Sequence, residues 1–183
     1  MGSINFFEKG LTSLVGLVPE GTITVWCENN YITSLEGLPR SIKIIYAKNN
    51  QITSLEGLSE RIEIIDVHNN NLTSLQGVPK NVWTIDCRYN NLTSLEGLPE
   101  KIESVFCDYN NLTSLQGLPE DIKFISCSGN NITSLEGVPE DIGLQYRYTP
   151  IWWKHLRENN FYDPTDNLEL SKGLIKITEH ISR

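Results

Sequence analysis

The sequence lacks any long hydrophobic run and has few basic residues for its length. Lys and Arg together number 15 against 23 Asp and Glu, which gives a formal net charge of −8. Its apolar stretches are only a few residues long, far short of the ~18 that a membrane-spanning helix needs. Binding to nucleic acid requires Lys and Arg clustered on one face. We therefore expect neither a membrane span nor a nucleic-acid partner.

Paired cysteine motifs are also missing. The cysteines are Cys27, Cys87, Cys107 and Cys127. They show no Cys-x-x-Cys spacing and no Cys/His pairing at ligand spacing, so a disulfide framework or a zinc site is the less favoured alternative. All four occupy one position of a repeat, where other copies hold Ala47 and Val67. We expect reduced thiols buried at a site for small apolar side chains, which suits the cytoplasm, and we expect no metal or cofactor.

What the chain does contain is a unit of about 20 residues that recurs along most of its length. Its copies start at the residue before Thr-Ser-Leu: Leu11, Ile32, Ile52, Leu72, Leu92, Leu112 and Ile132. They fit the consensus L-x-x-L-x-L-x-x-N-x-L, as in the run from Ile102 to Leu112. This pattern predicts a leucine-rich repeat solenoid, in which neighbouring coils cover each other's core.

Each copy divides into a strand and a return segment. In residues 42–47 the alternation predicts a short strand with Ile45 and Ala47 inward and Ile44 and Tyr46 outward. Stacked strands then form one parallel β-sheet on the concave side of an arc or horseshoe. Return segments such as 93–100 contain Gly and usually Pro, so we expect extended or polyproline-like backbone on the convex side.

An asparagine follows each strand at the ninth consensus position. These residues are Asn30, Asn50, Asn70, Asn90, Asn110 and Asn130. The chain leaves the sheet there, and its backbone polar groups need new partners. An amide side chain both donates and accepts, so it can serve its own coil and a neighbouring coil. We predict a structural role for this column of asparagines.

The repeat boundaries define three regions. Residues 1–10 form an N-terminal cap in which Ile4, Phe6 and Phe7 cover the first coil. Residues 11–148 form the solenoid of seven copies, the last of them incomplete because Gln145 and Arg147 fall at inward positions. Residues 149–183 form a C-terminal cap, for which helical spacing of apolar residues predicts two short helices.

Function is expected in the outward strand columns, because these vary between copies while the inward columns do not. Aromatic residues among mixed charges are typical of protein interfaces, and free drift of the columns would more often yield small polar residues. The candidate partner-binding residues are Trp26, Tyr46, Lys48, Asp66, His68, Asp86, Arg88, Phe106, Tyr109, Phe124 and Tyr146.

The units LTSLEGLPEKI and LTSLQGLPEDI, joined to strands that end in Cys-x-x-Asn-Asn, resemble the short bacterial-type leucine-rich repeats. That class occurs in secreted effectors of bacterial pathogens and in phage and large-virus proteins. The resemblance covers residues 11–148 and implies a non-enzymatic module that binds a partner protein through its concave sheet. For an effector or viral protein, it also implies action in the host cytoplasm.

Two other functions are compatible with the sequence. His68 with Asp66, Asp86 and Arg88 is a cluster with acid–base potential, but no nucleophile stands at a sensible spacing, so a solvated charge patch explains it better. A structural or self-associating repeat protein, in contact with itself through the sheet edge or the C-terminal segment, is the alternative to a monomeric binding module.

Overall fold

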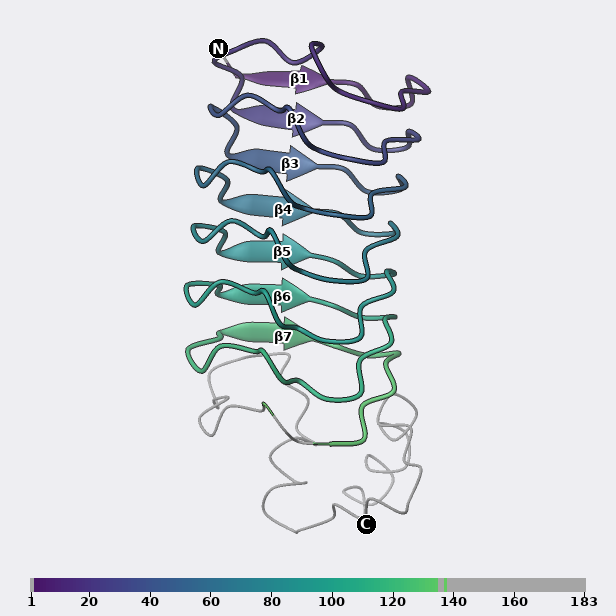
Figure 1. Ribbon diagram of the computed structural model, residues 1–183, viewed down its shortest axis with the longest axis vertical. Coiled ribbons are helices and arrows are strands. Elements are labelled where there is room, and N and C mark those ends of the chain that lie inside the picture. Colours follow the sequence, from purple (N-terminus) through teal and green to yellow (C-terminus); the bar gives the residue numbers. More distant parts are fainter. Residues whose placement is uncertain (1, 135–136, 138–183) are drawn as a thin grey trace, which may run out of the picture.

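The computed structural model describes residues 2–134 and residue 137. Seven short strands lie one above another in chain order and form a single parallel sheet (Figure 1). They are β1 (Ser3–Asn5), β2 (Thr24–Trp26), β3 (Ile44–Tyr46), β4 (Ile64–Asp66), β5 (Thr84–Asp86), β6 (Ser104–Phe106) and β7 (Phe124–Ser126). The chain leaves each strand, returns through a loop and enters the next strand one level further along the stack. The described residues therefore form a solenoid, as predicted.

The register of the sheet repeats the period of the sequence. Thr24 pairs with Ile44, and Ile44 pairs with Ile64, so equivalent residues of successive copies lie side by side. The strand around Ile45 is shorter than the predicted span of residues 42–47. On one side, the Ile42 N–H bonds to the Pro39 carbonyl in a tight turn. On the other side, pairing between coils continues past the strand, because the Ala47 N–H still donates to Asp66 O at 2.7 Å.

The core is a continuous column of inward side chains between the sheet and the return segments. Ile45 and Ala47 are fully buried, while Ile44 and Tyr46 are half-buried on the other face of the sheet, which confirms the predicted alternation. Leu95 is buried and Leu98 packs against the same core from the return segment. Each coil is therefore covered above and below by equivalent residues of its neighbours.

The cysteines belong to this core and are unpaired. Cys27, Cys87 and Cys107 are buried and Cys127 is partly buried. Burial raises the pKa of the Cys27 thiol to about 12, with a further contribution from the Glu28 carboxylate. Burial also raises the pKa of Cys127 to about 12. The thiols are therefore neutral at physiological pH and behave as small apolar side chains, as the sequence predicts.

The consensus asparagines connect neighbouring coils, which confirms their predicted structural role. The Asn50 amide donates to Ala47 O of its own coil at 3.0 Å and to Cys27 O of the preceding coil at 2.9 Å. Its Oδ1 accepts from the Ile32 N–H at 3.0 Å. Asn70, Asn90, Asn110 and Asn130 repeat these three contacts. Buried backbone groups that the sheet leaves unpaired thus gain partners in every coil.

The return segments contain turns but no helix or strand within residues 2–134. In one coil, Leu98 N–H bonds to Leu95 O and Ile102 N–H bonds to Pro99 O. Gly97 has φ +99°, and a Cβ there would lie 2.7 Å from the carbonyl carbon of Leu75 in the preceding coil. A side chain is excluded at this point because the backbones of two coils come into direct contact.

The first described coil is built like the others, although residues 1–10 do not fit the consensus. β1 pairs with β2, and Ile4 and Phe6 pack against the core. Phe7, in contrast, is 44% exposed. The predicted helices in residues 149–183 and the end of the seventh copy lie outside the described residues, and the curvature of the arc stays a prediction.

Candidate functional site

The face of the sheet turned away from the core carries half-buried side chains, and we call it the open sheet face. It consists of the outward side chains of β2–β7 together with two residues that follow each strand. These residues form four columns with one residue per coil. The column of the third consensus position begins at Thr24 and ends at Phe124, that of the fifth begins at Trp26 and ends at Ser126, that of the seventh begins at Glu28 and ends at Ser128, and that of the eighth begins at Asn29 and ends at Gly129. The outward strand residues are half-buried, because each is flanked by equivalent residues of the coils on either side.

An aromatic pair occupies the β2 and β3 end of this face. The rings of Trp26 and Tyr46 are parallel, with 6° between their planes and 5.9 Å between their centroids. The two residues face each other in the register of the sheet, so the pairing of the strands itself brings the rings together. Lys48, two residues further on, is exposed. The sequence prediction that these three residues share one surface agrees with the structure.

Charged side chains occupy the middle of the face. Asp66 and Asp86 are register partners on β4 and β5. The Arg88 guanidinium binds the Asp86 carboxylate through two nitrogens, Nε to Oδ1 at 2.9 Å and Nη2 to Oδ2 at 2.6 Å. Burial raises the pKa of Asp66, and the Asp86 carboxylate adds to the shift, while the hydrogen bond from the His68 backbone N–H opposes it. Asp86 is therefore paired, whereas Asp66 carries a less stabilised charge.

The β6 and β7 end carries a second aromatic pair. Phe106 and Phe124 lie with ring centroids 4.9 Å apart and planes tilted by 43°. Arg88 reaches this pair from the β5 coil, because its Cζ lies 5.6 Å from the centroid of Phe106. Asp108 beside them is buried and accepts hydrogen bonds from Ser126 Oγ at 2.7 Å and the Ser128 N–H at 2.9 Å. The charges at this end are thus satisfied within the protein.

A stack of rings runs along the edge of the open sheet face where the strands end. His68 stacks on Tyr89 at 5.2 Å, and Tyr89 stacks on Tyr109 at 4.4 Å, with angles of 13° and 16° between planes. Tyr89 is 45% exposed and Tyr109 is 53% exposed. Both have left-handed backbone, with φ 53° and 55°. Bulky residues seldom adopt that conformation, and such outliers concentrate at functional sites.

His68 interacts electrostatically with Asp66, whose pKa it lowers, and its ring stacks on Tyr89. Its backbone N–H, and not its imidazole, bonds Asp66 Oδ1 at 3.0 Å. Within the described residues, no group of three or more His, Cys, Asp or Glu is placed to hold a metal ion. The geometry gives no support to acid–base chemistry at this cluster.

The sequence does not single out as binding residues four exposed aromatic side chains, Phe7, Tyr31, Trp83 and Tyr89, of which the last two flank β5. Tyr89 belongs to the eighth consensus position, from which only Tyr109 was selected. Trp83 is 43% exposed just before β5, in the second consensus position. The same column holds one ion pair on each side of Trp83: Lys43 with Glu63 at 2.5 Å, and Lys123 with Glu103 at 2.7 Å. Counting variation in every non-consensus position of the strand would have selected both residues.

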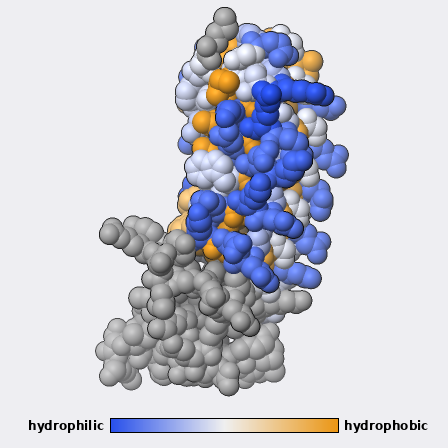
Figure 2. Space-filling view, turned by 90° about the vertical axis from the view of Figure 1, so that its left-hand side faces the viewer, coloured by the Kyte–Doolittle hydropathy of each residue, from blue (hydrophilic) through white to orange (hydrophobic). Residues whose placement is uncertain are grey.

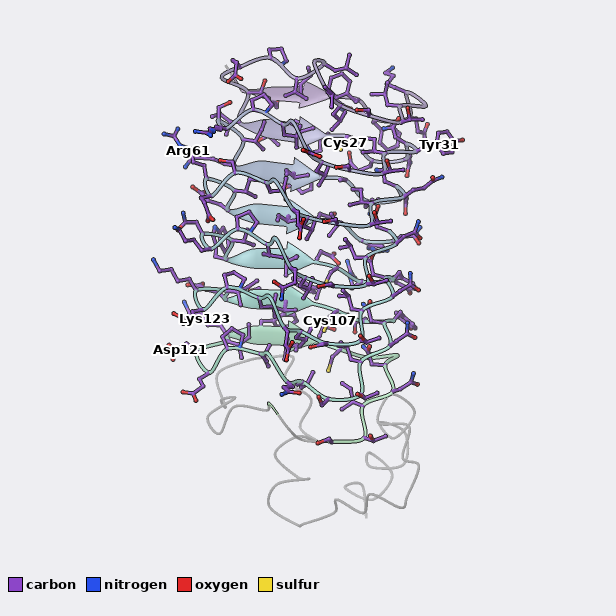
Figure 3. All side chains as sticks on the ribbon, in the orientation of Figure 1. Cys27, Tyr31, Arg61, Cys107, Asp121 and Lys123 are labelled. Atoms are coloured by element: carbon purple, nitrogen blue, oxygen red, sulfur yellow. The ribbon has the colours of Figure 1, made fainter. Side chains whose placement is uncertain are left out.

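The stack has two rims, one at each end of the strands. Figure 3 shows Arg61, Asp121 and Lys123 on the side where the strands begin, and Tyr31 on the opposite side, where the strands end. Figure 2 shows mostly hydrophilic residues on the side where the strands begin, with small hydrophobic areas between them. Of the candidate residues, Tyr146 lies outside the described part of the chain, and the other ten lie on the open sheet face.

The parallel sheet, the repeated register and the asparagine column together define the leucine-rich repeat fold. No family model matches the chain, and no curated protein matches its sequence. No residue of the described part belongs to a helix, so a helical membrane span is not found there. The assignment to the leucine-rich repeat fold therefore rests on the three-dimensional structure and on the sequence repeat.

Three solved structures with the same fold come from bacterial proteins. YopM from Yersinia enterocolitica WA-314 has a TM-score of 0.62 and 25% identity, covering 68% of this chain and 28% of YopM. A leucine-rich repeat domain of a Shigella effector has a TM-score of 0.55 and 22% identity, covering 73% of this chain and 51% of that domain. The functional domain of InlJ from Listeria monocytogenes, which includes a cysteine ladder, has a TM-score of 0.53, 21% identity and coverages of 63% and 27%. This chain spans at most about half the length of these proteins.

Proposed function

We propose that this protein is a non-enzymatic interaction module that binds a partner protein through the open sheet face. One observation carries the proposal: the aromatic pairs Trp26–Tyr46 and Phe106–Phe124 lie on the sheet face turned away from the core, where all four residues are only half-buried. Aromatic residues and Arg are enriched at interfaces, where a few of them account for most of the binding energy. The partner would contact the sheet along several coils.

The structural neighbours support a protein-binding role, because one of them is the repeat domain of a bacterial effector. We extend the proposal to an effector-like or viral protein that acts in the cytoplasm of a host cell. We further propose that the open sheet face is concave, which would let it enclose a rounded partner surface. Measurement of the solution envelope by small-angle scattering tests the curvature independently of binding.

The binding proposal is tested by removing the aromatic side chains without changing the core. A variant with Trp26, Tyr46, Phe106 and Phe124 replaced by Ala is compared with the unaltered protein in affinity capture from host-cell lysate. The matched control replaces Glu36, Glu56, Gln76 and Glu96, which are exposed in the return segments, by Ala. We expect the control to retain the captured partner and the first variant to lose it. Equal capture by the first variant, with its fold intact by circular dichroism, would refute the proposal.

A second candidate function, self-association, is favoured by the composition of the first coil. Val15 is 67% exposed at the position where later copies carry Glu36, Glu56 and Gln76. Phe7 and Leu17 of the same coil are both 44% exposed, and β1 is the edge strand of the sheet. End-to-end contact between two copies would cover these side chains. Light scattering over a range of concentrations tests this, with Val15→Glu expected to convert any dimer to monomer.

A further inference from the structure

The half of the open sheet face on β5–β7 contains a connected group of side chains that we call the aromatic patch. It comprises Arg88, Tyr89, Phe106, Tyr109 and Phe124. Three contacts connect it: Phe106 with Phe124 at 4.9 Å, Arg88 with Phe106 at 5.6 Å and Tyr89 with Tyr109 at 4.4 Å. Arg88 also interacts electrostatically with the Tyr89 hydroxyl, which places the two groups of contacts next to each other. We infer that this patch binds an uncharged, proline-rich extended segment of the partner protein, an inference that rests on the proposed function.

Two of the patch residues are present at a conformational cost that the fold does not require. At the positions equivalent to Tyr89 and Tyr109, earlier coils have Asn29, Asn49 and Asn69, and all five residues have φ between 53° and 57°. Asn adopts left-handed backbone more readily than Tyr does. The β7 coil has Gly129 at this position, which also permits the conformation. The local backbone therefore does not require the tyrosines. Their rings stack on each other, and the Tyr109 ring lies over Gly129, where an added Cβ would be 2.6 Å from Cδ1, yet both residues stay 45% and 53% exposed and are available to a ligand.

The charges of the patch indicate an uncharged ligand. Arg88 is held by Asp86 through three hydrogen bonds of 2.6 to 3.1 Å. Asp108 accepts from Ser126 and Ser128, and Glu103 is paired with Lys123. Because these charges already have partners, a charged ligand would have to break a pair to form its own. Neutral segments avoid that cost.

The hydrogen-bonding groups of the patch favour a ligand that accepts rather than donates. The Tyr89 and Tyr109 hydroxyls bond to each other, which leaves one hydroxyl proton of the pair able to donate, and Arg88 Nη1, which does not bind Asp86, can donate as well. The nearby carboxylates of Asp86 and Asp108, which could accept, are already occupied. A proline-rich segment offers unpaired backbone carbonyls and has few or no N–H groups. Its pyrrolidine rings pack on aromatic rings, as in other recognition of polyproline helices.

The length of the patch sets the length of the ligand. Phe124 stands at the third consensus position and Tyr109 at the eighth, five residues apart along the strand direction. At roughly 3.3 Å per residue this is at most about 17 Å, because Tyr109 lies beyond the end of β6 and has left-handed backbone. A polyproline helix rises about 3.1 Å per residue, so a segment of about five or six residues crosses the patch. Such a helix is largely formed before binding, which lowers the entropic cost of capture.

The experiment uses the full chain and a fluorescein-labelled decaproline peptide, with binding followed by fluorescence anisotropy. We expect binding that changes little between low and high salt, because no ion pair forms. Tyr89→Asn with Tyr109→Asn should weaken binding at least about tenfold, as loss of interface anchors does. The double substitution installs the residue that three other coils already carry at this position, so the fold should be retained. The matched control, Glu36→Ala with Glu56→Ala in the exposed return segments, should bind decaproline within about twofold of the unaltered protein.

Three results would overturn the inference: absence of decaproline binding, equal binding by the tyrosine double variant, or tighter binding of a deca-arginine or deca-glutamate peptide. These results leave the proposed function intact if the variant lacking Trp26, Tyr46, Phe106 and Phe124 rings still loses its partner in the capture experiment. If that variant keeps its partner, the proposed function fails on its own evidence. The two failures are therefore distinguishable.

Discussion

The edge of the sheet where the strands end is built in two ways in the two halves of the molecule. In the coils of β2–β4, side-chain amides form a chain of hydrogen bonds, with Asn49 donating to Asn29 at 2.6 Å and Asn69 donating to Asn49 at 2.8 Å. In the coils of β5 and β6, the rings of Tyr89 and Tyr109 stack instead. The backbone is left-handed in both halves.

This difference separates what the repeat needs from what this protein adds to it. The repeat needs a left-handed residue before each consensus asparagine, and Asn meets that need with a side chain that bonds to its neighbour. Tyr89 and Tyr109 meet it less well but present aromatic surface to solvent. The fold is thus equally complete in both halves, and the second half adds exposed aromatic side chains at this edge.

The largest effect is expected at the consensus asparagines, and it tests whether they stabilise the two halves of the molecule equally. Asn50→Leu and Asn90→Leu should each lower the free energy of unfolding by about 3 kcal/mol or more, because several buried backbone groups lose their partners. Urea denaturation followed by circular dichroism measures this. The exposed neighbours provide controls, since Gln51→Leu and Asn91→Leu should change stability by less than about 0.5 kcal/mol. A small effect at either buried position would contradict the equivalence.

The second prediction concerns the return segments, where the halves differ in how closely the coils approach. At Gly37 an added Cβ would meet only Val15 Cγ2, at 3.4 Å, whereas at Gly97 it would meet backbone atoms of Leu75 and Gln76 at 2.7 to 2.9 Å. Gly37→Ala should cost about 1 kcal/mol from its positive φ alone. Gly97→Ala should cost about 3 kcal/mol, since the coils must also separate. Thermal unfolding of the two variants side by side checks the ranking, and equal losses would show that the coils adjust freely.

The third prediction concerns replacing the stacked tyrosines at the edge of the sheet by the asparagines that the other half carries there. Tyr89→Asn with Tyr109→Asn should change the free energy of unfolding by no more than about 1 kcal/mol, because the lost stacking is offset by a residue that accepts left-handed backbone. Tyr89→Val should destabilise by more, about 2 kcal/mol, since a β-branched residue is strained there. Urea midpoints distinguish the cases. Strong destabilisation by the Asn substitutions would mean that the rings serve the fold rather than a partner.

The smallest effect is expected at the junction between the halves. The folded protein raises the pKa of Asp66, so its charge destabilises the folded state, and Asp66→Asn should stabilise by up to about 0.5 kcal/mol at pH 7. The gain should vanish as pH falls below the ordinary range of an aspartate, where the unfolded state also holds the proton. Asp86→Asn should instead destabilise slightly, because Arg88 loses its partner. Unfolding measured from pH 3 to 8 tests both signs.

The fold was largely predictable because its determinants are local and repeated. The alternation of Ile44, Ile45 and Tyr46 sets which face each side chain takes, and the period sets the register. The sequence does not reveal β1, since residues 3–5 lack the consensus and gain a strand only by pairing with β2. The strand predicted at residues 42–47 is also longer than the observed β3, Ile44–Tyr46. The hydrogen bond from Ile42 N–H to Pro39 O holds Ile42 in a turn, and the sequence pattern does not reveal this bond.

The candidate site was predictable as a face but not as a set of contacts. The outward columns follow from alternation, which correctly placed Trp26, Tyr46 and Phe106. The stack of His68, Tyr89 and Tyr109 crosses between columns, so alternation along one strand cannot reveal it. The pairing of Asp86 with Arg88 likewise depends on rotamers. Tyr146 and the C-terminal helices stay predictions.

The register step from β2 to β7 has a consequence for how such a protein changes over generations. Every coil pairs with the next at the same interval, from Thr24 with Ile44 to Ser104 with Phe124. Loss or duplication of one unit of twenty codons would therefore leave the strand pairing between neighbouring coils in the same register. It would also move the Trp26–Tyr46 pair towards or away from the aromatic patch by one strand spacing, about 4.8 Å. Recombination between copies of the gene segment can thus change the distance between two contact regions in discrete steps, without any new core having to evolve.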